Sequence, residues 1–204
     1  MKTIYGNEPH DLGLNMAVRT LASITCPNGW DLVPTFEEAP TTLQDVIAYA
    51  KEHGRLCIAM EDSDGTIYAD EETNWHLRAW HDSIHFRHKL AFTAAGEAAA
   101  SYVQVAQLYR KYHKTHSREQ LVVWGSLILA DILGLVHYHQ RTGLWPKNKR
   151  AGTLKNAPGW ATQAELIFDE CQGPDHEEKA LRLSAGKWGY PYDTRLIFGG
   201  NANA

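Results

Sequence analysis

The chain has 204 residues, of which 44% are hydrophobic and 22% charged, and its formal net charge is −4 with the histidines neutral. A chain of this length and composition can bury a sizeable core, which excludes a disordered protein and favours a single domain over residues 1–204. No basic block stands out in the sequence, so broad electrostatic binding to nucleic acid is not indicated.

The cysteines and the apolar segments indicate where the protein works. Cys26, Cys57 and Cys171 are widely spaced and form no C-x-x-C pair, which argues against a disulfide framework and a thiolate zinc site. The N-terminus lacks the apolar segment of a signal peptide. The longest apolar run, residues 121–136, is shorter than the roughly 20 residues of a membrane span and contains Asp131. We therefore expect a soluble, cytoplasmic protein without membrane contact.

Hydrophobic periodicity, caps and turn signals predict a mainly α fold, a helical bundle-like body with one β-hairpin. The expected helices cover residues 14–24, 41–53, 74–89, 96–112, 118–141, 161–171 and 175–185. The hairpin is expected at about residues 55–70, because two strand-like runs flank Asp64-Gly65, a strong type I′ turn signal. Residues 187–204 are aromatic and apolar, so we expect this tail to dock on the body, on a second copy or on a virion neighbour.

A histidine-rich segment lies within the expected helical core, about residues 74–146. Four of the eleven histidines fall between residues 76 and 88. His81 and His85 are four residues apart, so a helix places them one turn apart on one face, where two imidazoles can share a metal ion. Asp82 lies beside them and is a candidate ligand or catalytic base.

Two further carboxylates could complete such a site. Asp131 lies inside the most apolar helix of the chain, and a buried carboxylate needs a cation, a hydrogen-bond network or a metal. Arg78 or Arg87 could be its partner, or it could bind the metal directly or accept a hydrogen bond from a ligand histidine. Glu97 could reach the site from the next helix as a ligand or catalytic group, or it could be a first-turn Glu favoured by the helix dipole.

The segment His81-Asp82-Ser83-Ile84-His85 is similar to the H-E-x-x-H motif of zincin peptidases, where Glu acts as the base on water. Here Asp replaces Glu, and no third histidine of the metzincin type follows. The pair His81-Asp82 with the distant Asp131 also resembles part of the HD phosphohydrolase pattern, over residues 81–131. That family has an additional early histidine, for which His53 and His76 are poorly placed.

Several short motifs occur together over residues 74–146. They are Arg78-Ala79-Trp80-His81-Asp82, Gly96-Glu97-Ala98, Asp131-Ile132-Leu133-Gly134, and Gly143 with Pro146. This set resembles a group of bacteriophage-encoded proteins of no settled function, many with an R-A-x-H-D segment, a second His and a G-E pair. The chain departs from them in the position of His85 and in Asp131, where others often have Glu. The resemblance implies a viral protein in a bacterial cytoplasm or a virion, and it implies no reaction.

Together these features predict a metal-dependent hydrolase. Its metal ligands would be His81, His85, Glu97 and Asp131, and its catalytic groups Asp82 and Glu97. Imidazole and carboxylate donors suit Zn²⁺, Mn²⁺ or Fe²⁺. The substrate would be a phosphoester or nucleotide, or a peptide. Two alternatives remain: a non-haem iron oxygenase, and a non-enzymatic phage structural or interaction protein whose histidines serve a polar core.

Overall fold

The computed structural model of the chain describes residues 10–144, 146 and 148–189. Its elements, in chain order, are α1 (Leu12–Thr25), β1 (Trp30–Val33), α2 (Leu43–His53), β2 (Leu56–Ala59), α3 (Glu71–His88), α4 (Ala94–Tyr112), α5 (Arg118–Leu129), the π-helix η1 (Ala130–Gly134), α6 (Leu135–Thr142), α7 (Lys149–Asn156), the 3₁₀-helix η2 (Ala157–Trp160), α8 (Ala161–Glu170) and α9 (His176–Trp188). The fold is mainly α, as predicted.

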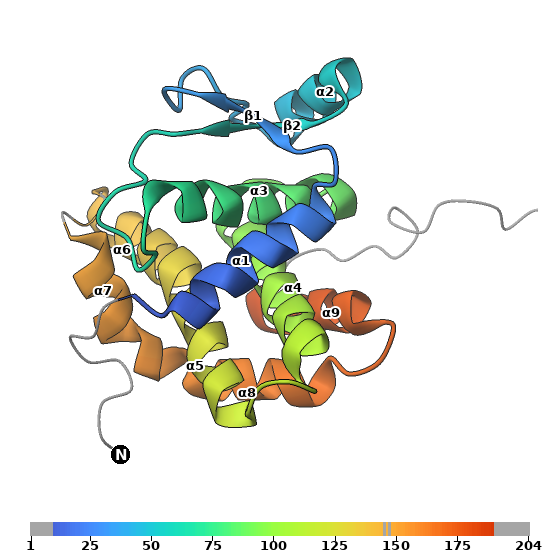
Figure 1. Ribbon diagram of the computed structural model, residues 1–204, viewed down its shortest axis with the longest axis vertical. Coiled ribbons are helices and arrows are strands. Elements are labelled where there is room, and N and C mark those ends of the chain that lie inside the picture. Colours follow the sequence, from blue (N-terminus) through green and yellow to red (C-terminus); the bar gives the residue numbers. More distant parts are fainter. Residues whose placement is uncertain (1–9, 145, 147, 190–204) are drawn as a thin grey trace, which may run out of the picture.

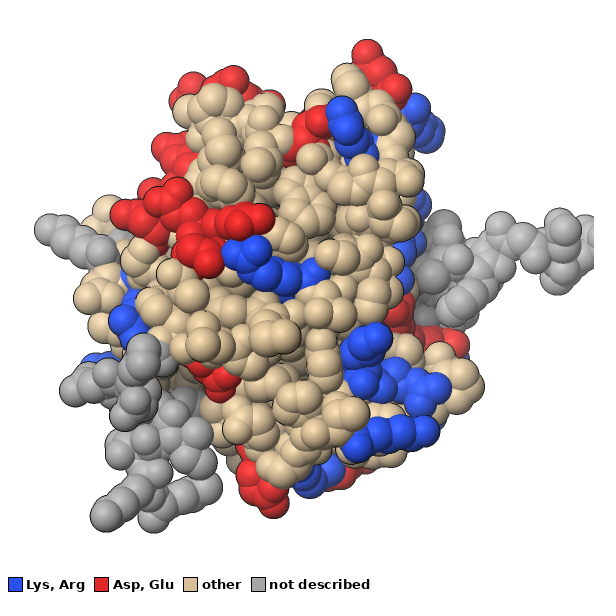
Figure 2. Space-filling view, in the orientation of Figure 1, with Lys and Arg blue, Asp and Glu red and all other residues tan. Residues whose placement is uncertain are grey.

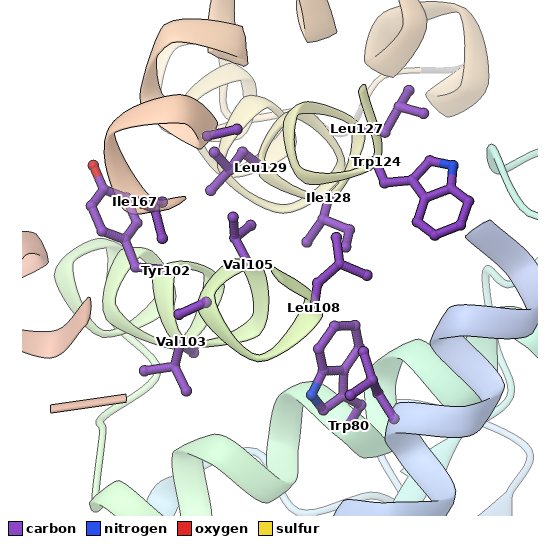
Figure 3. Close-up of a cluster of buried hydrophobic side chains, with 14 of the residues drawn as sticks. Trp80, Tyr102, Val103, Val105, Leu108, Trp124, Leu127, Ile128, Leu129 and Ile167 are labelled. Carbon is purple, nitrogen blue, oxygen red and sulfur yellow. The ribbon is translucent and has the colours of Figure 1, made fainter. Parts of the chain in front are cut away.

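Helix α3 divides the molecule into two parts. Figure 1 shows the two strands and α2 on one side of α3, and α1, α4, α5, α8 and α9 on the other. The larger core lies on the second side, where Val105 and Leu108 of α4 pack between Ile128 of α5 and Trp80 of α3 (Figure 3). Helix α4 is buried at nearly every position from Gly96 to Leu108, so it is the central helix of this core.

The predicted hairpin at residues 55–70 is wrong. Strand β2 instead pairs in parallel with β1, with Trp30 opposite Leu56 and Val33 opposite Ala59, and α2 connects the two strands. Gly65 does adopt the left-handed conformation of a turn, with φ of 61°. The residues after it, however, turn back onto α1, where the Ala69 N–H donates to Asn15 Oδ1. Burial of Ile67 and Tyr68 in the helical core replaces the strand pairing that the local signal predicted.

The long apolar segment is continuous helix from Arg118 to Thr142, made of α5, η1 and α6. By length and composition alone this helix could cross a membrane, but 61% of its most apolar window is buried inside the protein. It therefore matches the predicted core helix, and the structure is compatible with a soluble protein. The π-helical turn at its middle contains Asp131 and alters the direction in which that side chain leaves the helix.

The C-terminal tail is described only at its beginning. Trp188 closes α9, and its indole N–H donates to the Tyr102 hydroxyl in the core. Residues 190–204, which make up most of the predicted docking tail, lie outside the described residues.

Gly96 in the first turn of α4 should tolerate no side chain, because a Cβ there would lie 1.9 Å from the carbonyl oxygen of Ala91. We expect Gly96→Ala to lower the free energy of unfolding by about 2 to 3 kcal/mol, measured by urea denaturation. The matched control is Gly152→Ala in α7, where a Cβ meets no atom within 4 Å. That substitution should raise stability by about 0.5 kcal/mol through helix propensity, and equal losses in both variants would contradict the packing argument.

Candidate metal centre

The candidate site lies where α3 and α4 meet, and His81, His85 and Glu97 form it. His81 Nε2 is 2.9 Å from Glu97 Oε2 and 3.0 Å from His85 Nε2. His85 Nε2 is 3.6 Å from Glu97 Oε1. One donor atom from each residue lies within 4.8 Å of the other two. The structure thus brings together three of the four metal ligands predicted from the sequence.

The turn between α3 and α4 explains how Glu97 reaches the histidines. Lys89 ends α3 in the left-handed conformation, and its N–H donates to the His85 carbonyl. Thr93 then caps α4, its hydroxyl accepting from the Gly96 N–H. This short connection folds α4 back across α3, so that the first turn of α4 faces the last turns of α3. Glu97 lies in the first turn of α4, where the helix dipole favours an acidic residue, and its carboxylate also faces the two imidazoles.

The second nitrogen of each imidazole has an acceptor. His85 Nδ1 is 2.9 Å from the Leu90 carbonyl oxygen, which can only accept, so Nδ1 carries the proton. His81 Nδ1 is 2.8 Å from Gln104 Oε1 and donates to it in the same way. When both imidazoles are neutral, each Nε2 atom then carries a lone pair. The two lone pairs are directed at each other and at the Glu97 carboxylate. Such lone pairs require a cation between them, either a proton or a metal ion, and histidines that bind metals are held in this way.

The distances fit one ion. Two donors that are each about 2.1 Å from an ion, at angles between about 90° and 110°, lie about 3.0 to 3.4 Å apart. The separations of 3.0 Å between the two Nε2 atoms and 2.9 Å from His81 Nε2 to Glu97 Oε2 fall close to this range, and the 3.6 Å contact of His85 is with the other carboxylate oxygen, Oε1. Three donors on one side of an ion leave its other positions open, as in sites with two histidines and one carboxylate.

Burial and mutual attraction both affect the protonation of His81 and Glu97. Burial by itself disfavours a charged imidazole, but the Glu97 carboxylate offsets this effect and raises the pKa of His81 to about 9. Burial by itself would raise the pKa of Glu97, but His81 and His85 hold that pKa well below its usual range. Without metal, therefore, a proton on His81 occupies the place that an ion would take.

A cavity of about 450 Å³ opens beside the site. His81 and Glu97 line it together with Asp82, Asp131, Arg78 and Lys149. Its walls are otherwise largely apolar and include Phe36, Pro40, Ile58, Leu77, Ile132, Leu135 and Val136. His85 is fully buried and does not line the cavity, so His81 and Glu97 are the two members of the group that face it.

Asp82 lines the cavity next to His81 but is not one of the three clustered donors. Its carboxylate makes no hydrogen bond or ion pair with the residues that the structure describes. Burial raises its pKa, an effect that His81 and His85 oppose and Glu97 reinforces. A partly exposed carboxylate with a raised pKa and no partner is suited to accept a proton from water in the cavity.

Asp131 also lines the cavity but lies outside the group of three. It is 6% exposed and accepts a hydrogen bond from Thr153 of α7, 3.1 Å away. Burial raises its pKa to about 6, although Thr153, Tyr68, Lys149 and Arg78 all act in the opposite direction. Arg78, considered as its partner in the sequence, instead donates to the carbonyls of Ala59, Glu61 and Asp62.

Some residues of the site were not singled out in the sequence. Gln104 lies on α4 two turns after Glu97, and this spacing is the signal that could have revealed it as a partner of His81. Thr153 and Lys149 come from α7, far along the chain, and no local pattern connects them to Asp131. His88 does not extend the site, because it bonds to Glu177 of α9.

Comparison of the chain with models of known families, with curated proteins and with solved structures found no match.

Metal-free protein should lose stability as pH rises from about 6.5 to about 9. The pKa of His81 is raised on folding, so the stabilisation is complete below the unfolded value and disappears as the pH passes the folded one, about 9. We expect a loss on the order of 2 kcal/mol, measured by thermal unfolding in chelator. The pKa of Glu97 is lowered, so its contribution disappears as pH falls below about 4.5. In Glu97→Gln, the loss of stability at high pH and the loss at low pH should both become smaller. An unchanged dependence of stability on pH in that variant would refute the pairing of His81 with Glu97.

Asp131→Asn should stabilise the metal-free protein above pH 6. The pKa of Asp131 is raised on folding to about 6, so its ionisation in the folded protein costs stability as pH rises through that value. The amide keeps an acceptor for Thr153 and carries no charge. We expect a gain of about 2 kcal/mol at pH 8 that vanishes near pH 4, measured by urea denaturation at both values. A loss of stability at pH 8 would show that the charge of Asp131 is compensated.

Proposed function

We propose that the protein is a metal-dependent hydrolase whose ion is held by His81, His85 and Glu97. One observation carries this proposal: the Nδ1 atoms of both imidazoles lie within hydrogen-bond distance of oxygen acceptors, and their Nε2 atoms lie close to each other and to the carboxylate. Mn²⁺, Fe²⁺ and Zn²⁺ all accept two imidazoles and a carboxylate.

The other residues around the three donor atoms would each have a separate role in hydrolysis. A bound divalent ion would supply Lewis acidity and promote ionisation of water. Asp82 would take the proton from the attacking water, because its carboxylate is unpartnered among the described residues and faces the same cavity. Gln104 and the Leu90 carbonyl hold the imidazoles in the required tautomer. The apolar walls would bind the non-reacting part of the substrate and exclude water.

The substrate would be a small molecule or a short peptide segment, because the cavity holds about 450 Å³. Arg78 and Lys149 line it and offer positive charge to a phosphoester or a carboxylate. Much of that charge is already met by Asp62, since Lys149 Nζ is 3.4 Å from its carboxylate and also donates to its carbonyl. A nucleotide or other phosphoester and a peptide therefore both remain candidates.

A non-haem iron oxygenase is the second candidate, and the donor set itself favours it. Two histidines and one carboxylate on one side of an ion are the ligands of that class. The unpartnered Asp82 favours hydrolysis, because oxygen activation needs no proton acceptor of this kind beside the ion. Oxygen consumption by the iron-loaded protein separates the two chemistries.

The proposed setting is the reducing cytoplasm of a bacterial host or a virion assembled there, as the resemblance to phage-encoded proteins implies. The three cysteines are all buried and free, which suits that compartment.

Purified protein should hold about one divalent ion per chain after reconstitution, measured by elemental analysis. His81→Ala, His85→Ala and Glu97→Gln should each weaken metal affinity by at least about 100-fold, because the first two remove a donor atom and the third removes the negative charge of the carboxylate. His76→Ala is the matched control on α3, since among the described residues His76 makes its hydrogen bond with a carbonyl of its own helix and packs on Trp30. Full retention of metal in all three site variants would refute the proposal and favour a structural polar core.

Asp82→Asn should retain the metal and lose activity by about 100-fold or more, as expected for removal of a general base. The measurement is turnover of the reconstituted protein on a panel of phosphoesters and peptides. Loss of metal in Asp82→Asn would instead make Asp82 a ligand.

A further inference from the structure

A second hollow, separate from the candidate metal centre, is lined by four Lys or Arg residues and two histidines beside apolar residues at the end of α1. Its volume is about 710 Å³, and it lies between the end of α1, the end of α4 and the start of α9. The basic residues that line it are Arg87, Arg110, Lys111, Lys114, His113 and His176. Figure 2 shows Lys and Arg side chains gathered at the lower right of the face in view, beside the end of α4. No residue lines both this hollow and the cavity of the metal centre.

The positive charge of this hollow is not neutralised within the described residues. The side chains of Arg110, Lys111 and Lys114 make no hydrogen bond or ion pair with any residue that the structure describes. Glu177 is the acidic residue among those lining the hollow, and it is already engaged. It accepts from Arg87 at 3.2 Å, from Gln107 at 2.6 Å and lies 2.8 Å from His88 Nε2. The Glu177 carboxylate is therefore paired with side chains of α3, and the cations at the end of α4 have no acidic partner among the described residues.

Helix capping explains only part of this arrangement. Cations in the last turn of a helix interact favourably with its dipole, which accounts for Arg110 and Lys111 at the end of α4. The dipole of α3 and the ion pair with Glu177 account for Arg87, but neither explains Lys114 beyond the end of α4 or His176 at the start of α9, which line the same hollow. The segment 110–118 has four Lys or Arg residues and no acid, a local excess of positive charge that the net charge of −4 and the lack of a longer basic block did not indicate.

We infer that this basic hollow binds the phosphate backbone of a nucleic acid. Unpaired Lys and Arg side chains at several points suit a chain of phosphates better than one isolated anion, and each contact made would release counterions. Arg110 can hold a phosphate with two parallel hydrogen bonds, and the lysines act as point charges. The hollow is far larger than one phosphate group, so a strand passing along it can meet successive cations. Because the hollow offers no base-reading pattern, binding is expected to be independent of base sequence.

The test uses the full chain and a fluorescently labelled single-stranded oligonucleotide of about 20 nucleotides, titrated by anisotropy between about 50 and about 200 mM salt. The site variant combines Arg110→Gln, Lys111→Gln and Lys114→Gln. The matched control combines Lys51→Gln, Arg141→Gln and Lys155→Gln, which removes the same charge from exposed positions outside the hollow. Circular dichroism and the melting temperature establish that both variants are folded, since all six side chains are solvent-exposed or at the surface.

We expect the wild type to bind with an affinity that falls as salt rises. The site variant should bind at least about 10-fold more weakly, and its slope of log affinity against log salt should be smaller by about 2, from about 0.7 per lost phosphate contact. The control variant should change far less on both measures. The proposal is overturned if the two variants weaken equally, or if the wild type does not bind at the lowest salt. It is also overturned if pyrophosphate or polyglutamate binds as tightly as the oligonucleotide, because the ligand would then be a small phosphate compound or an acidic peptide.

Discussion

The hydrogen bond between His81 and Glu97 is the contact on which the polar interior depends. It joins the two central helices at a place where water is largely excluded, so the charges of the two side chains must be balanced within the protein. Gln104 and the Leu90 carbonyl occupy the outer nitrogens of the imidazoles and restrict where a positive charge can be placed. A proton on His81 satisfies the arrangement, and so would the proposed ion. Proton and ion therefore compete for one position, which couples metal binding to pH.

Helices α3 and α4 also contribute to the apolar core, so polar and apolar contacts lie next to each other along this helix pair. Trp80 is fully buried between α3 and α4, and its indole N–H donates to Gln107. Gln107 in turn donates to Glu177 of α9. Two separate sets of polar contacts thus lie along α4, one joining His81 to Gln104 and the other joining Trp80 through Gln107 to α9, inside a core that is otherwise apolar. Such a network specifies the register of α3 against α4, because sliding one helix would leave several buried groups without partners.

The parts of the site that follow from local spacing could be predicted from the sequence. The i, i+4 relation placed His81 and His85 together, and a helical hairpin of this length brings Glu97 to them. The parts that depend on distant contacts could not. Gly65 adopts a positive φ, but burial of Ile67 and Tyr68 against helices outweighs the strand pairing expected after it, and β2 pairs with β1. Asp131 lies in a π-helical turn that the residue pattern does not predict, and its hydrogen bond with Thr153 depends on tertiary packing.

The two charge clusters lie at opposite ends of α4, and the polarity of that helix suits both. Glu97 is in its first turn, where the dipole stabilises negative charge, and Arg110 and Lys111 are in its last, where positive charge is stabilised. Thirteen residues at about 1.5 Å each separate Glu97 from Arg110 by about 20 Å, beyond a Debye length at physiological salt. The clusters therefore neutralise each other little, and each retains its charge for a ligand. Because the helix itself favours both charges, the chain can fold with these groups ionised, and ligand binding can draw on charges that are already in place.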